Sequence, residues 1–122
     1  MADRYKIPAN VKREAKLSLV MMKNGFMGGT KTGWDRAKQL SRCTYLPHKD
    51  ALVMRAWFAR HGPRAKNGGT SYPGYKQWIH DGKPLDLKNN ETYGMYRKRR
   101  GAISYLLWGG ESARKWIEKL SL

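Results

Sequence analysis

Apolar side chains recur at intervals of three and four residues along most of the chain, which is the spacing that places them on one face of a helix. A first face of this kind begins just after Asn10, a favourable N-cap, and runs to about Gly25, a favourable helix stop. Its apolar members are Val11, Ala15, Leu19 and Met22. The same spacing predicts further helices over residues 34–41, 47–60, 90–108 and 111–120.

Local signals mark the ends of the middle helices. Thr32 with Asp35 matches a capping box, so we expect the second helix to start there, around Trp34. Pro47 suits the first turn of the third helix, and Gly62 with the proline after it ends that helix. The third helix is rich in large apolar side chains, and it is expected to be the most buried.

Residues 62–90 hold five glycines and three prolines with little periodicity, so this part is predicted to be irregular. Within it, residues 75–80 fit either a single helical turn or a short strand. Strand signals are otherwise nearly absent. The predicted fold is therefore all-α, a compact bundle of four to six short helices with an irregular insertion at about 62–90, forming one domain over residues 1–122.

Composition narrows the class of protein. Hydrophobic residues make up 40%, with five Trp and seven Tyr, which is enough for one modest core. The longest apolar stretch, residues 17–22, is far below the roughly 20 residues of a membrane span, and no apolar secretion signal follows the N-terminus. Cys43 stands alone, so we expect no intramolecular disulfide and a reducing compartment.

The net charge of +16 points to an anionic partner, because like charges on one small domain repel each other. The charge is not a tail: residues 1–61 carry 13 basic and 4 acidic side chains, and residues 62–122 carry 12 and 5. Nucleic acid, DNA rather than RNA, is the expected partner, bound mainly through its phosphates. The alternative is a charged surface that only aids solubility, and a membrane surface is not expected to be a partner.

Arg97 to Arg100 is the densest basic run, and the end of the third helix can extend the same patch. One of the arginines near that helix end can instead pair with Asp50 or Glu111. The residues expected to contact nucleic acid are Lys12, Lys16, Arg36, Arg55, Arg60, Arg97, Arg99 and Arg100.

Other chemistries find less support in the sequence. The glycine-rich segment 25–32 superficially resembles a phosphate-binding loop, but Thr30 stands where that motif needs glycine, and a tight passage between helices explains the glycines as well. The amides of residues 29–33 can still bind a backbone phosphate. Cys43 and the three histidines match no zinc pattern, and His61 fits a packed histidine whose charge suits a helix end. No cofactor, no metal and no catalytic activity are expected.

Two further interpretations concern how nucleic acid is read. Residues 34–60 have the outline of a helix-turn-helix, although the second helix is unusually apolar for one lying in a groove of DNA. Tyr72, Tyr75 and Trp78 lie beside Lys76 and can stack on unpaired bases. The alternative for these aromatic residues is that they fasten their segment to the core.

Three stretches together resemble a small domain that recurs in proteins of tailed bacteriophages. They are residues 28–40 (GGTKTGWDRAKQL), 54–61 (MRAWFARH) and 103–110 (ISYLLWGG), with Trp116 beyond. Between His61 and Tyr96 this chain carries what resembles an insertion, so the resemblance implies no role for residues 66–92. It implies a phage source, in the infected cell's cytoplasm or the virion, and a compact helical fold, but no reaction. The rival functions are a virion structural component, in the head or tail, and a host-directed inhibitor protein.

Overall fold

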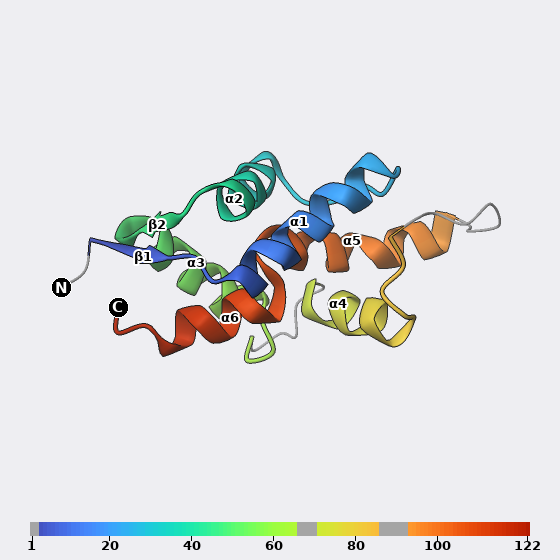
Figure 1. The fold of residues 1–122 in the computed structure, drawn as a ribbon. Coiled ribbons are helices and arrows are strands. Elements are labelled where there is room, and N and C mark those ends of the chain that lie inside the picture. The colour runs from blue at the N-terminus through green and yellow to red at the C-terminus, as the bar shows by residue number, and fades with distance from the viewer. Residues whose placement is uncertain (1–2, 66–70, 86–92) are drawn as a thin grey trace.

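The computed structural model of the protein describes residues 3–65, 71–85 and 93–122, the last range with side chains from residue 100 onward. Over these residues the chain forms six helices and one small antiparallel sheet, which confirms the all-α class (Figure 1). The elements are β1 (Arg4–Lys6), α1 (Ala9–Lys23), α2 (Lys31–Arg42), β2 (Tyr45–Pro47), α3 (His48–His61), α4 (Ser71–His80), α5 (Tyr93–Leu107) and α6 (Gly110–Lys119). None of the helices in these ranges is long and apolar enough to span a membrane.

Helix α5 is the central element and packs against α1, α2, α4 and α6 (Figure 1). From Ala102 to Trp108 every side chain except that of Ser104 is buried. Helix α3 was expected to be the most buried helix, but Val53 is 46% exposed and Ala56 is exposed. The expectation was wrong because only one stripe of α3 meets the rest of the bundle.

Aromatic rings fill the centre of the core. The ring of Tyr105 lies 4.7 Å from that of Tyr75 and 5.5 Å from that of Phe58, and Trp57 stacks on Trp108 at 4.9 Å, measured between centroids. These contacts join α3, α4 and α5. A few large rings therefore supply the buried area that a chain poor in aliphatic residues needs.

Helix boundaries follow local backbone chemistry. Helix α1 ends at Lys23, and Gly25 takes φ +101°, as predicted for a helix stop. Helix α2 begins three residues earlier than Trp34, because Thr30 is its N-cap and accepts a hydrogen bond from the amide of Gly33. The predicted capping box of Thr32 with Asp35 is therefore wrong, and Thr30 is the N-cap of α2.

Three elements were not predicted. Strands β1 and β2 pair antiparallel, with Tyr5 opposite Leu46, in segments for which the spacing predicted no element. Helix α4 lies within the segment predicted to be irregular, and it packs closely on α5: a Cβ on Gly74 would lie 2.9 Å from the Cα of Gly101. Because β2 separates α2 from α3, the connection is not the short turn of a helix-turn-helix.

Candidate functional site

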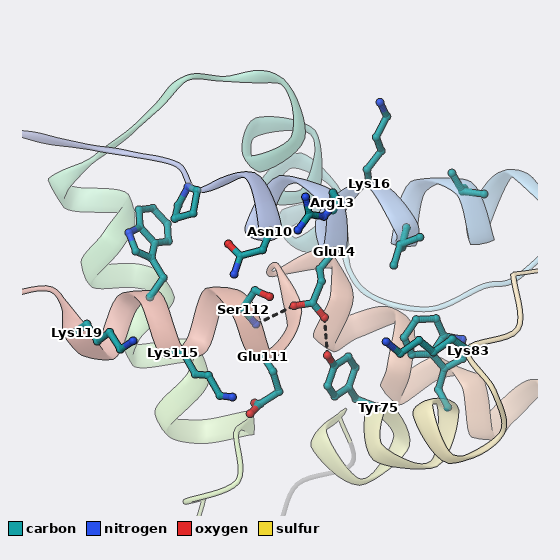
Figure 2. A pocket seen from close by; sticks show the side chains of 15 residues that line it. Asn10, Arg13, Glu14, Lys16, Tyr75, Lys83, Glu111, Ser112, Lys115 and Lys119 are labelled. Carbon is teal, nitrogen blue, oxygen red and sulfur yellow. Dashed lines mark hydrogen bonds between the residues drawn. The ribbon is translucent and has the colours of Figure 1, made fainter.

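A groove of about 860 Å³ lies between α1, α6 and the C-terminal end of α4 (Figure 2). Among the described residues, five exposed cationic side chains line it. They are Arg13, Lys16, Lys83, Lys115 and Lys119. We call this hollow the basic groove.

The two long walls of the basic groove carry the same sequence spacing. On α1 four of the lining residues, Arg13, Lys16, Leu17 and Val20, are spaced at three, four and seven residues from the first. On α6 four of them, Ser112, Lys115, Trp116 and Lys119, have the same spacing. These intervals place four side chains on one face of a helix, so each wall presents two cations on such a face, beside the carboxylates Glu14 and Glu111 and the amide Asn10.

Glu14 forms the floor of the basic groove and joins three helices (Figure 2). One of its carboxylate oxygens accepts a hydrogen bond from the Tyr75 hydroxyl at 2.5 Å, and the other accepts one from the Ser112 amide at 2.8 Å. Burial, together with the carboxylate of Glu14, raises the pKa of Tyr75 far above its usual range, so this hydroxyl stays protonated and donates. Glu14 therefore acts as a clamp between α1, α4 and α6.

The second carboxylate that lines the basic groove, that of Glu111, is neutralised by the guanidinium of Arg114 on the same helix. The guanidinium of Arg114 holds it with two hydrogen bonds of 2.7 Å, and the Tyr105 hydroxyl donates to it as well. Burial alone would raise the pKa of Glu111, but the hydrogen bonds from Arg114 and Tyr105 outweigh it and lower that pKa. Glu111 is thus ionised and paired, and the unpaired charge of the basic groove is positive.

Lys83 lines the basic groove and has a strained backbone conformation. Its φ of +56° is the only positive value at a non-glycine position among the described residues. In this region Cβ crowds the following carbonyl oxygen, at a cost of about 1 kcal/mol or more. A residue held in such a conformation beside a cavity is often kept for its side chain rather than for stability.

Lys83→Gly should therefore raise the free energy of unfolding, by about 0.5 kcal/mol once the greater freedom of glycine in the unfolded chain is subtracted. Lys83→Ala removes the same charge but keeps the strain, and it should give no gain. Urea unfolding of the two variants beside the natural protein measures the difference. Equal stability of the glycine and alanine variants would contradict the strain.

The structure does not gather the cations predicted from sequence on one surface. Lys16 alone lines the basic groove, while Lys12 on the same helix donates to the Cys43 carbonyl at 2.6 Å. Arg55 lines a separate hollow of about 240 Å³ between α3 and α6. Arg60 and Arg100 are exposed on α3 and α5, and the side chains of Arg97 and Arg99 lie outside the described residues.

Arg36 is buried, with 9% of its side chain exposed. Its guanidinium lies 3.3 Å from Asp50 and over the ring of Trp108, and it donates to Gln39. It is Arg36, and not an arginine at the end of α3, that pairs with Asp50. We therefore remove Arg36 from the residues expected to contact phosphate.

The glycine-rich loop before α2 is explained by packing. A Cβ on Gly29 would lie 2.3 Å from Leu107 Cδ1, and one on Gly28 would lie 3.2 Å from the backbone of Arg100. The loop thus passes closely over α5. This packing agrees with the interpretation of the glycine-rich segment as a tight passage between helices. The amide of Gly33, one of those considered for binding phosphate, already donates a hydrogen bond to Thr30.

The aromatic residues of α4 face the core. Tyr75 is 4% exposed and Trp78 is 1% exposed, and the indole N–H of Trp78 donates to the Pro84 carbonyl at 2.9 Å. These rings fasten α4 to α5, so two of the three aromatic residues considered for base stacking have no free face. Only Tyr72 is partly exposed, with Lys76 Nζ 5.8 Å from its ring centre.

His61 packs against Trp57 at a centroid distance of 4.7 Å. Burial, and then the charge of Arg60, lower its pKa below 6.5, so the fold disfavours the charge that was expected to suit the helix end. The unfolded chain takes up this proton below pH 6.5 before the folded protein does. The stabilising contribution is full above that pH and declines as the pH falls toward the lower, folded-state value.

His61→Gln should therefore flatten the fall in unfolding free energy between pH 7 and about pH 5. Ala59→Gln, at an exposed position on the same helix, adds the same side chain without removing a titratable group, so it is the control and should leave the profile unchanged. Chemical unfolding at a series of pH values measures both. If the unfolding free energy of His61→Gln depended on pH as that of the natural protein does, the lowered pKa of His61 would be contradicted.

The sequence did carry a signal for the basic groove. The residues missed were Arg13, Lys83, Lys115 and Lys119. The spacing of Arg13 on α1 and of Lys115 and Lys119 on α6 predicts two cationic faces, but not that these faces meet.

Within the described residues no three His, Cys, Asp or Glu side chains are placed to hold a metal ion. Comparison with protein-family models, curated proteins and solved structures finds no match for this chain.

Proposed function

We propose that the protein binds nucleic acid through the phosphate backbone and catalyses no reaction. The observation that carries this proposal is the basic groove, where cations from two helices and from the segment after α4 surround carboxylates that are already bonded. Arg and Lys side chains neutralise phosphates and release condensed counterions, which is the main source of affinity in such complexes.

The use of the acidic residues supports the same proposal. Asp50 pairs with buried Arg36, and Glu111 and Glu118 share Arg114 at 2.7 Å and 3.0 Å. These three carboxylates are bound to internal partners, so they do not neutralise the exposed cations of the basic groove. An excess of positive charge of this kind attracts a polyanion from a distance and steers its association.

The resemblance to the tailed-phage domain extends the proposal to a place of action, either the infected cell or the virion. A virion structural protein would be expected to show a continuous apolar contact face. The large hydrophobic side chains that are exposed in the described residues are instead spread over separate segments. They are Val20, Met27, Tyr45, Val53 and Ile79. This distribution favours nucleic acid over a structural role.

The test is a salt titration of affinity for a fluorescent oligonucleotide. With five groove cations facing phosphates, the logarithm of the association constant should fall against the logarithm of salt with a slope of about −3 or steeper. Charge-matched polyglutamate serves as a control for simple attraction and should bind more weakly. Affinity that is equal at 50 and 300 mM salt, or no binding at the lower salt, would overturn the proposal.

A further inference from the structure

We infer that the basic groove takes single-stranded nucleic acid, with its phosphates along the cationic rims and its bases turned toward the floor. This inference rests on the proposed function and names the kind of nucleic acid. It follows from the shape of the groove, the arrangement of its charges and the position of one tryptophan.

The shape of the basic groove favours an unpaired strand. A DNA duplex is a convex cylinder, and proteins read it by inserting a protruding helix or ribbon into its grooves. The basic groove is a hollow between α1 and α6, and its volume of about 860 Å³ lies within the range of sites that enclose a small ligand. Charged grooves that follow a backbone are typical of proteins that bind single strands.

The charges are spread lengthwise rather than gathered at one point. Lys115 and Lys119 are one helical turn apart, about 6 Å along the axis of α6, and Arg13 and Lys16 are about 4.5 Å apart along α1. All four are exposed. Lys16 points outward from α1, away from Glu14 (Figure 2). Two rows of cations suit a chain of phosphates, whereas a lone anion would need convergence on a single point.

The floor of the basic groove is aromatic and carries a negative charge, unlike its cationic rims. Tyr75, Trp78 and the carboxylate of Glu14 line it, and a phosphate would be repelled there. A base offers flat faces and amino groups to such a floor, since a carboxylate with two bonds made can still accept others. The charges therefore favour an orientation of the strand in which the phosphates lie at the rims and the bases point inward.

Trp116 supplies a stacking surface beside the cations. It lies on the α6 wall between Lys115 and Lys119 and is partly buried, whereas Trp57, Trp78 and Trp108 are at most 9% exposed. Stacking of bases on aromatic side chains is tolerant of sequence and is a main source of affinity for single strands. A bound strand should thus quench the fluorescence of Trp116.

The experiment compares two double variants of the full chain that change charge equally. Lys115→Glu with Lys119→Glu reverses two exposed cations of the basic groove, and Lys38→Glu with Arg42→Glu reverses two exposed cations at the same spacing on α2. Binding of a single-stranded DNA 12-mer, its duplex and the matching RNA is followed by fluorescence anisotropy. Circular dichroism checks that both variants are folded.

We expect the groove variant to bind the single-stranded DNA at least about tenfold more weakly, and the α2 variant to lose no more than about threefold. Both single strands should bind more tightly than the duplex. Equal losses in the two variants would overturn the inference, and so would tighter binding of the duplex. Neither result would overturn the proposed function, which fails only if no nucleic acid binds or salt has no effect.

A second readout follows the aromatic contact alone. Quenching of tryptophan fluorescence by the 12-mer should be lost in Trp116→Phe and kept in Trp34→Phe, a partly buried tryptophan on α2. Quenching that persists in Trp116→Phe would overturn stacking in the basic groove.

Discussion

Gly110→Ala should lower the free energy of unfolding by about 3 kcal/mol, a large fraction of the roughly 5–15 kcal/mol by which a native domain is stable. Gly110 has φ +65°, where a side chain costs about 1–2 kcal/mol. A Cβ there would also lie 2.3 Å from a carboxylate oxygen of Glu14. The clash displaces the acceptor that holds Tyr75 and Ser112, which leaves buried donors without a partner.

Gly82→Ala is the matched control. Gly82 also has a positive φ, +93°, but a Cβ there would meet nothing within 4 Å. It should therefore lose only the backbone contribution, about 1 kcal/mol. Urea unfolding with both variants separates the two effects. Equal losses would contradict the role of Glu14 as the clamp between helices.

Most of the helices follow from local spacing, and the exceptions have physical causes. Pro73 and Gly74 are helix breakers by local rules, yet Pro73 lies in the first turn of α4, where its missing N–H needs no partner. Gly74 is needed for close approach to α5. Local rules count such residues against a helix, because the benefit arises only when a second helix is present. The strands of three residues are too short to show alternation.

The basic groove could be predicted only in part. Each wall is a readable helical face, but the walls come from opposite ends of the chain: Glu14 and Ser112 are 98 positions apart. The densest basic run in the sequence, residues 97–100, lies elsewhere in the chain and does not indicate this site. A site made by two sparse stripes becomes visible only when the helices that carry them are placed side by side.

Arg36→Met should lower the free energy of unfolding by about 2–3 kcal/mol, because it leaves the carboxylate of Asp50, 20% exposed, without its cation. Adding Asp50→Leu should restore part of the loss, since no unpaired charge then remains. The coupling in this double-mutant cycle, measured by chemical unfolding, gives the interaction between the two side chains. Losses that simply add would contradict a direct pair.

Arg36→Lys decides whether this residue acts in the fold or on the ligand. Lysine keeps the charge but lacks the planar fork that reaches Asp50 and Gln39 and lies over Trp108. A residue that acts only on phosphate would lose neither stability nor affinity, because a lysine also neutralises phosphate. We expect instead a loss of stability of about 1–2 kcal/mol, with oligonucleotide affinity within about twofold of the natural protein while the variant is folded. Unchanged stability would contradict the structural role of Arg36 and would return this residue to those expected to contact nucleic acid on α2, away from the basic groove.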